Sequence, residues 1–363
     1  MKIIAYYLPQ YHPIKENNEW WGPGFTEWTN VGKARKYYKD HYQPKIPKDL
    51  GYYDLRIPEV RQQQAELAKE AGVDAFCYWH YWFGNGRRLL EMPFNEVLKT
   101  GKPDFPFCLG WANESWKAKV WDFNSTKRDR TLMEQLYPGE QDYKDHFYAL
   151  LDAFRDTRYL RKNNRPIFVI YKPFLLPDPA LFMSIWNKLA VKEGISDGFH
   201  FIGHTEKTKD VDSLLSIGFN AVNIVRNGEY AHNLNLIKKI LIPTIKYKIL
   251  KRPLKIDYAL MIKYFVQSKE KEANIYPSII PNWDHTPRSG RKGSIFHNST
   301  PELFAEHVQE VFDALTHKEE EDQIVFLKSW NEWGEGNYME PDLRFGKRYI
   351  EVLGKIRKDY ENK

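Results

Sequence analysis

A chain of 363 residues with 42% hydrophobic residues can build a full core in one large domain or two ordinary ones, which excludes wholesale disorder. The net charge of +6 is mild for this length and gives no reason to expect nucleic acid as a partner. Aromatic residues reach 15%, with 12 Trp and 23 Tyr, more than a core of this size needs. Because Trp and Tyr line carbohydrate clefts, some of these rings are expected to do so, while others must belong to the core.

The cysteines and the N-terminus indicate the cell compartment. Cys77 and Cys108 fall in predicted buried strands, so we expect small core residues in a reducing compartment and no disulfide framework. No CxxC or HExxH motif occurs, so we expect no metal site, and we expect no cofactor. The chain begins directly with a strand, shows no secretory signal and contains no run of ~18 apolar residues, which predicts a cytoplasmic protein, either free or at the inner membrane face.

The first strand and the loop after it carry the first candidate site residues. We predict a strand over 2–7, followed by a Leu-Pro-Gln-Tyr-His-Pro sequence, and then a long aromatic loop over 17–34. Loops of this length and composition are usually functional, so each side chain there could face a cleft or pack on its own loop. The candidates for substrate binding are Tyr7, Gln10, His12, Trp21, Glu27 and Trp28.

The next two strands also end in aromatic and polar residues. A helix is predicted over 58–71, a strand over 73–83, a helix over 89–98 and a strand over 105–110. His80 stands in the aromatic cluster of the first of these strands, where it could bind a substrate hydroxyl or be a satisfied core group. The second strand leads to further candidates for substrate binding, Trp111, Asn113, Glu114 and Trp116.

The alternation of strands and helices continues to the end of the chain. Further strands are predicted near residues 166, 199, 221, 276 and 324, and helices over 143–154, 180–192, 211–217, 301–315 and 349–358. The strand near residue 276 ends in three more candidates for substrate binding, Asn282, Trp283 and Asp284.

One segment, residues 236–265, interrupts the pattern. Between Lys238 and Lys263 it contains 8 Lys or Arg residues against one acidic residue, with isoleucines and leucines interleaved. Pro243 and Pro253 forbid one continuous helix. Such a basic insertion could touch an anionic membrane surface or a lipid-linked substrate, or it could be a solvated excursion.

The last strand leads into a stretch with two closely spaced carboxylates. Carboxylates between indole rings at a strand end suit acid/base work on a sugar, because the rings offer flat apolar faces and desolvation raises the pKa of a nearby carboxyl. A solvated acidic loop is the alternative. We predict Glu332 and Glu335 as the catalytic pair. The neighbouring candidates for substrate binding are Trp330, Asn331, Trp333 and Glu340.

Eight strands that alternate with helices predict an α/β fold, a single-domain (β/α)8 barrel with long βα loops over 1–363. The absence of a glycine-rich fingerprint after the first strand argues against a dinucleotide-binding fold. Active sites of such barrels lie at the C-terminal ends of the strands, where all the clusters above would converge.

Three motifs spread over almost the whole chain read YYLPQYHPIKENNEWWGPGFTEWTNV, WANESWKAKVWD and SWNEWGEGNYMEPD. They resemble the signatures of the WbsX-type proteins, a glycoside hydrolase family 99-like group that is found with surface-polysaccharide biosynthesis genes. The group includes retaining endo-α-mannosidases and endo-α-mannanases on a (β/α)8 barrel. The resemblance therefore implies an endo-acting α-glycosidase or transglycosylase, with a mannose-type substrate as one option.

The resemblance also implies roles for the two glutamates. The paired carboxylates of the hydrolases occur as Glu-Trp-X-Glu, which matches Glu332 and Glu335. By position, Glu332 would be the base on the sugar's own 2-hydroxyl, which attacks the anomeric carbon. Glu335 would be the general acid to the leaving oxygen and then a base for the incoming water. The hydrolases often have His where this chain has Gly334.

Two other functions fit parts of the sequence. WbsX-type members are also labelled glycosyltransferases of lipopolysaccharide, capsule or O-antigen biosynthesis, and a lipid-phosphate donor would suit the basic insertion. No nucleotide-binding domain is recognised in the sequence. A non-catalytic sugar-binding module is the third option. In each case the expected partner is an oligo- or polysaccharide, free or lipid-linked, and peripheral membrane association remains an alternative.

Overall fold

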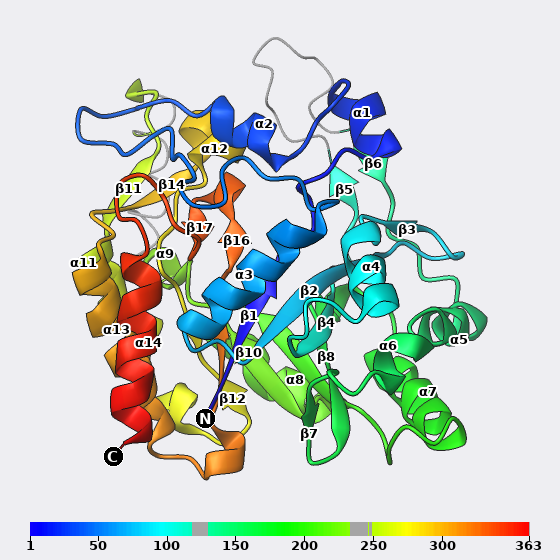
Figure 1. The fold of residues 1–363 in the computed structure, drawn as a ribbon. Coiled ribbons are helices and arrows are strands. Elements are labelled where there is room, and N and C mark those ends of the chain that lie inside the picture. Colours follow the sequence, from blue (N-terminus) through cyan, green and yellow to red (C-terminus); the bar gives the residue numbers. More distant parts are fainter. Residues whose placement is uncertain (118–129, 233–245, 247–248, 363) are drawn as a thin grey trace.

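A ring of parallel strands forms the centre of the fold in the computed structural model, which describes residues 1–117, 130–232, 246 and 249–362 (Figure 1). The strands follow one another around the ring nearly in chain order. They are β1 (Lys2–Tyr7), β2 (Ala75–Trp82), β4 (Phe107–Trp111), β8 (Arg165–Ile170), β9 (His200–Thr205), β10 (Ala221–Ile224), β12 (Ile275–Tyr276), β13 (Ser278–Ile279) and β15 (Ile324–Leu327).

Pro277 divides one strand position of the ring into two short pieces. On its N-terminal side β12 pairs with β10, and on its C-terminal side β13 pairs with β15. The strand β15 in turn pairs with β1, so this interrupted strand connects the two ends of the sheet. The result is a TIM-type barrel with eight strand positions, and the predicted (β/α)8 fold is confirmed.

Most of the predicted helices pack outside the barrel at their predicted positions. Their bounds are α3 (Pro58–Glu70), α4 (Met92–Thr100), α5 (Glu140–Ala149), α6 (Leu151–Arg155), α7 (Pro179–Lys192), α8 (Val211–Ile217), α13 (Pro301–Leu315) and α14 (Arg348–Glu361). Two predictions differ in detail. The helix expected to start at residue 89 starts at Met92, because Arg88–Leu89 forms a short strand β3 against β2. The helix expected over 143–154 is two helices, α5 and α6.

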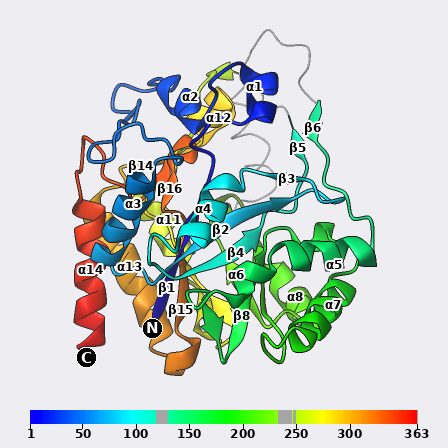
Figure 2. The same ribbon diagram turned by 45° about the vertical axis from the view of Figure 1, so that its right-hand side comes forward.

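The segment predicted as a long loop, 17–34, contains two helices. These are α1 (Lys15–Trp21) and α2 (Glu27–Gly32), and the prediction of a plain loop was wrong. Thr26 explains the start of α2, because its side chain accepts a hydrogen bond from the backbone N–H of Trp28 at 3.3 Å. Both helices lie above the C-terminal ends of the barrel strands, together with the short helix α12 (Thr286–Ser289) (Figures 1 and 2).

The described end of the basic insertion belongs to the folded body. Leu254–Asp257 is a strand, β11, that pairs with β14 (Ser294–His297), and Tyr258–Phe265 is the helix α11. One face of α11 is buried, with Tyr258 and Met261 fully enclosed, so this part packs on the folded body and is not a solvated excursion. Residues 233–245 and 247–248 of the insertion lie outside the described part of the chain.

Cys77 and Cys108 are free and fully buried, as expected of core residues. They lie side by side in register on β2 and β4. Within the ranges that the structure describes, every helix is too short or too polar to cross a membrane.

Candidate active site

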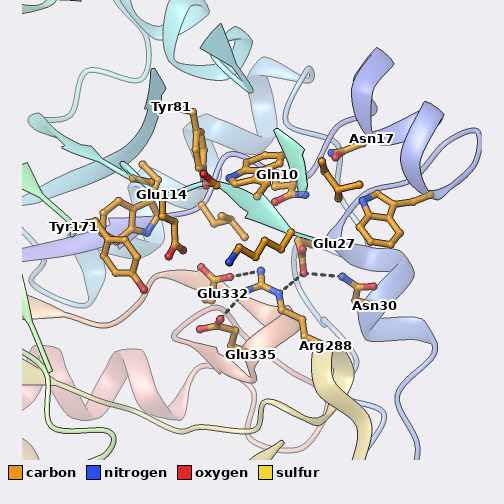
Figure 3. A pocket seen from close by; sticks show the side chains of 18 of the residues that line it. Gln10, Asn17, Glu27, Asn30, Tyr81, Glu114, Tyr171, Arg288, Glu332 and Glu335 are labelled. Carbon is orange, nitrogen blue, oxygen red and sulfur yellow. Dashed lines mark hydrogen bonds and ion pairs between the residues drawn. The ribbon is translucent and has the colours of Figure 1, made fainter. Parts of the chain in front are cut away.

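A cavity of about 460 Å³ opens at the C-terminal face of the barrel, under α1, α2 and α12 (Figure 3). Its polar wall contains four carboxylates, from Glu27, Glu114, Glu332 and Glu335, together with Arg288 and Lys328. Its aromatic wall contains Trp21, Phe25, Trp79, Tyr81, Trp116 and Tyr171. Carboxylates beside indole and phenol rings form a surface that suits a sugar. The aromatic side chains can stack on the apolar face of the sugar ring, and the carboxylates can bind its hydroxyl groups.

A short hairpin after β15 positions the two predicted catalytic glutamates. Glu332 ends the strand β16 (Asn331–Glu332), and Glu335 ends a single 3-10 turn over Trp333–Glu335. The backbone N–H of Glu332 donates to the Ser329 hydroxyl at 3.1 Å. The Tyr11 hydroxyl donates to the Asn331 carbonyl and accepts the Trp333 N–H at 3.1 Å, so the loop after β1 holds the hairpin in place.

Arg288 of α12 joins three of the carboxylates (Figure 3). Its Nε donates to Glu27 Oε2 at 3.1 Å and its Nη1 to Glu335 Oε1 at 2.7 Å. Its Nη2 donates to Glu332 Oε1. The guanidinium is therefore anchored on α2 and holds both predicted catalytic side chains in one plane of hydrogen bonds.

Because Gly334 has no side chain, Glu27 and Arg288 can lie directly against its backbone. A Cβ at this position would lie 2.1 Å from Glu27 Oε2 and 3.0 Å from Arg288 Nε. The backbone at Gly334 does not lie in the left-handed region, so the requirement for glycine is one of space alone. Any side chain at this position would collide with the Glu27–Arg288 pair in its present place.

The two glutamates differ in their electrostatic surroundings. Burial raises the pKa of Glu332 to about 7; Arg288 opposes this shift, while the charges of Glu335 and Glu27 add to it. Burial also raises the pKa of Glu335, but Arg288 and a hydrogen bond from His285 outweigh it and hold that pKa well below its ordinary value. The distance from His285 Nε2 to Glu335 Oε1 is 3.4 Å. At neutral pH the site can therefore hold one proton and one negative charge on the pair.

The structure brings several of the predicted site residues to this cavity. Besides the glutamate pair, these are Gln10, Trp21, Glu27, Glu114 and Trp116. They come from the loops after β1 and β4, and from the helices that those loops contain. Side chains from separate loops thus converge on the cavity, as the barrel fold predicts.

A first group of predicted residues lies away from the cavity wall, in the core or beneath the loops. The Tyr7 hydroxyl donates to Gln64, the Trp111 indole donates to the Trp82 carbonyl, and the Trp28 indole donates to the Tyr53 carbonyl. His80 stacks on His146, with 2.9 Å between their Nε2 atoms. Of the two predictions for His80, the contact agrees with a satisfied core group and not with a substrate-binding side chain. The other two members are His12, which is buried, and Asn113, which is bonded to Lys172.

A second group surrounds the catalytic hairpin from behind. Trp333 donates to Glu340 at 2.6 Å and stacks on Tyr338, while Asn331 bonds both backbone groups of Leu8. Asn282 and Trp330 are buried in the same region. Asp284 and Trp283 line a separate, smaller cavity, where Asp284 accepts a hydrogen bond from Gln43 and bonds His41. These side chains support the hairpin without reaching the main cavity.

The sequence had not marked several residues that line the cavity. The most consequential is Arg288, which lies four residues past Asp284 and therefore beyond the strand end. Others include Asn17, Asn30, Trp79, Tyr81, Tyr171 and Lys328. Tyr171 and Lys328 directly follow β8 and β15, so the strand-end rule that found Glu114 could have found them too.

Comparison with known proteins agrees with the motifs. The family model described as Glycosyltransferase WbsX matches residues 3–353. Two curated relatives are 34% identical to this chain over 354 residues. Both are called uncharacterized protein WxcX, and they come from two different strains of Xanthomonas campestris pv. campestris. The match covers 96% of this chain and 48% of each relative, so the chain spans about half the length of these relatives.

Two solved structures resemble the barrel. The GH99 endo-alpha-mannosidase from Bacteroides thetaiotaomicron has a TM-score of 0.58 at 15% identity, over 99% of this chain and 97% of that chain. A glycoside hydrolase-like protein has a TM-score of 0.55 at 14% identity, over 98% of this chain and 93% of that chain. At these identities the likeness concerns the fold. The chain belongs to the WbsX family and has a barrel fold similar to that of the GH99 glycoside hydrolases.

Proposed function

We propose that the protein is a retaining glycan-processing enzyme, an endo-acting α-glycosidase or a transglycosylase, that acts on a surface polysaccharide or its precursor. The observation that carries the proposal is the pair Glu332 and Glu335 at the cavity, buried and held by one guanidinium. Burial raises the pKa of both carboxyls and Arg288 lowers it, and the net result is a raised pKa for Glu332 and a lowered one for Glu335. A pair with different pKa values can supply the acid and the base that glycoside cleavage needs.

The proposed reaction needs two proton transfers in its first step. One carboxylate removes a proton from the sugar's 2-hydroxyl, whose oxygen then forms a bond to the anomeric carbon. The bond from the anomeric carbon to the leaving oxygen breaks, and the other glutamate donates its proton to that oxygen. In the second step, water or the hydroxyl of another sugar attacks the anomeric carbon and gives up its proton to the glutamate that acted as the acid. The bond from the anomeric carbon to the 2-oxygen breaks, and that oxygen takes back its proton from the first carboxyl, which gives hydrolysis or transfer with retention.

The cavity walls fit a carbohydrate substrate. Trp21, Trp79 and Trp116 provide aromatic faces, and Gln10 and Glu114 provide groups that bind hydroxyls. Several of these side chains come from opposite sides of the opening (Figure 3). The walls alone do not select a mannose-type ring over other hexoses, so a mannose-type substrate is the part of the proposal that rests on resemblance.

The test of the proposal is a pair of glutamine variants. Glu332→Gln and Glu335→Gln are expected to lose most glycan cleavage or transfer while the fold and the glycan affinity persist, because the amide keeps the shape and removes the proton transfer. Glu351→Gln, at an exposed site on α14, is the matched control and should keep full activity. Turnover near the wild-type level in either active-site variant would contradict the proposal.

A specific observation also favours transfer from a lipid-linked donor as a second candidate. Ile249 and Leu250 are 68% and 50% exposed, and Lys251 and Arg252 follow them directly. An exposed apolar pair beside cations suits the surface of an anionic membrane. Ile249→Ser with Leu250→Ser is expected to release the protein from anionic liposomes, whereas Leu343→Ser, exposed to 60%, should not. Equal liposome binding by both variants would leave this candidate without support.

A further inference from the structure

One wall of the main cavity contains three uncharged carboxamide side chains, Gln10, Asn17 and Asn30, which we call the amide wall. Gln10 comes from the loop after β1, Asn17 from α1 and Asn30 from α2. The backbone N–H of Glu27 donates to the Gln10 carbonyl at 3.1 Å, which holds this loop against α2. Tyr171 lies on the opposite side of the pocket, so the amide wall is a surface of its own (Figure 3).

The amide wall contains buried polar atoms that lack a hydrogen-bond partner. Among the residues that the structure describes, nothing bonds either side-chain polar atom of Asn17 or the Oδ1 atom of Asn30. Asn17 is fully buried and Asn30 is 2% exposed. Leaving a buried donor or acceptor unpaired is destabilising, so such atoms in a native fold call for an explanation. Both residues line the cavity, which makes a bound ligand the natural partner.

Asn17 is also unexpected in its helix. It is the buried residue of α1, a position that an apolar side chain normally takes in a helix packed on a protein. The next residue, Asn18, has an ordinary structural contact, because its Oδ1 accepts the Gly24 N–H at 2.8 Å. Two neighbouring asparagines of one helix therefore differ, and the folded chain itself uses the polar group of only Asn18.

The free atoms suit a neutral group that both donates and accepts. Asn17 offers a donor and an acceptor, and Asn30 offers a second acceptor. The N–H and C=O of an acylamino group point in opposite directions, so they need partners on separate side chains, such as these two. Trp21 and Phe25 line the same cavity with ring centroids 5.8 Å apart, and they offer an apolar surface to the acyl methyl group.

The amide wall does not suit a charged group. The neighbouring carboxylate of Glu27 accepts from Arg288 at 3.1 Å and from the Asn30 amide at 3.3 Å. Because this carboxylate is already paired, it is not available to neutralise an ammonium group. A carboxylate on the ligand would lack the donor that the free acceptors need, and it would face the like charge of Glu27.

We propose that the amide wall is a subsite for an N-acylamino sugar, such as a residue that carries an acetamido group. The inference rests on the proposed function for the place of this subsite along a glycan. The proposed reaction uses the 2-hydroxyl of the cleaved residue, so the acylamino group belongs to a neighbouring residue. Gln10 is only partly buried, so the acyl group meets it first and reaches the two closed asparagines by displacing a side chain of the wall.

Binding can be measured on the full chain without turnover. The probes are pairs of α- and β-linked disaccharides of glucose, galactose or mannose that carry either an acetamido or a hydroxyl group at one C2 position. The acetamido member of at least one pair is expected to bind about tenfold or more tightly, because the hydroxyl member leaves buried polar groups unpaired. Saturation-transfer NMR should show the acetyl methyl group in contact with the protein. Equal affinity within every pair, or no binding of any member, overturns the inference.

Asn17→Leu separates a ligand-binding role from a structural one. It is expected to abolish the preference for the acetamido sugar, while Tm stays the same or rises, because two unpaired polar atoms leave the interior at similar volume. Asn18→Leu is the matched control, and it should keep the preference and lower Tm, since it loses the bond to Gly24. A lower Tm with an unchanged preference in Asn17→Leu would show a structural residue and overturn the inference.

Gln10→Ala is the second variant, at a partly buried position where the fold is not at risk. It is expected to weaken binding of the acetamido sugar about tenfold, and unchanged binding would contradict the place given to Gln10. Because the readout is affinity, this inference can fail while Glu332 and Glu335 still support turnover. Conversely, an inactive protein can still show the acetamido preference.

Discussion

Glu340 shows how a buried carboxyl supports the catalytic hairpin without touching the cavity. It accepts hydrogen bonds from the Trp333 indole at 2.6 Å, the Gln64 amide at 2.6 Å and the Tyr53 hydroxyl at 2.9 Å. Burial raises the pKa of Glu340 to about 7, although these bonds oppose the shift. The side chain therefore connects the β16 hairpin to α3 and to the loop before it.

Glu340→Gln is expected to destabilise the protein by about 1–3 kcal/mol. The glutamine N–H₂ group would replace a carboxyl oxygen that accepts hydrogen bonds, so at least one of the three buried donors would lose its acceptor. The folded state binds the Glu340 proton more tightly than the unfolded chain does. The free energy of unfolding that this proton contributes is therefore fully present below pH 4.5 and is lost as the pH rises through about 7. The deficit of the variant should consequently shrink between pH 5 and pH 8 in urea unfolding. A deficit that grows with pH would contradict this account, and Glu351→Gln serves as the control.

At the scale of single residues, strand-end position predicted two glutamates that line the cavity but not all of their surroundings. The strand-end rule led to Glu332 and Glu335, and to Gln10 and Glu114 on the same cavity. It could not tell which neighbouring side chains turn inward, and Asn331 and Trp333 bond the backbone or Glu340 behind the hairpin instead. That direction depends on the hairpin geometry, which the tertiary fold decides.

At the scale of elements, the position of α12 decides where Arg288 and His285 lie. A Cβ added at Gly293 would lie 2.8 to 2.9 Å from backbone atoms of His285 and Thr286, so the chain after α12 passes directly against its start. The backbone at Gly293 has φ of −70°, which any residue can adopt. The glycine is therefore needed for the close approach of two backbone segments.

Gly293→Ala is expected to push α12 away from the pair and lower activity about 100-fold, the usual effect of misplacing a site by about 1 Å. A loss of stability of about 1–3 kcal/mol should accompany it, since backbone atoms cannot move aside as a flexible side chain can. Kinetics and thermal melting against Gly32→Ala would check this. Full activity in Gly293→Ala would show that α12 does not need its present position.

Some helices could be predicted from hydrophobic periodicity and others could not. Hydrophobic periodicity placed α8 and α13 within the observed bounds, because each has one clear apolar face. It missed α1 and α2, which are short and rich in Trp and Asn; α2 begins with a capping box at Thr26, whereas α1 has no side-chain cap. It also mistook α11 for part of a basic excursion, although its buried face is apolar.

At the scale of the whole molecule, the barrel was predictable because apolar strands alternate with helices along the whole chain. Another global property follows from the burial of histidines. Burial lowers the pKa of seven of them. The pKa falls to about 4 for His12 and His200 and to about 3 for His307, and it is also lowered for His80, His146, His204 and His297. These rings stay neutral in the fold while the unfolded chain takes up protons below pH ~6.5.

The protein is therefore expected to lose stability as the pH falls from about 6.5 to 4, with each such histidine contributing roughly 1.4 kcal/mol per pH unit at most. Glu332, Glu340 and Glu310 have the opposite sign in part of this range, because their pKa values are raised, but they are three groups against seven. Urea unfolding at pH 5.5 and 7.5 would measure the slope. His307→Gln, which can still accept the Ile280 N–H at the core, should reduce it; a wild-type slope of the opposite sign would contradict the prediction.

The proposed chemistry itself can be tested on the host's own glycan. Purified protein would be incubated with the surface polysaccharide, or with its lipid-linked repeat unit, and new reducing ends or transfer products would be followed by mass spectrometry. The account predicts shorter glycans or elongated acceptors with retained anomeric configuration from the wild type, and neither from Glu332→Gln or Glu335→Gln. A glycan that the wild type binds but leaves intact, with both glutamine variants binding equally well, would contradict it and identify the barrel as a sugar-binding module.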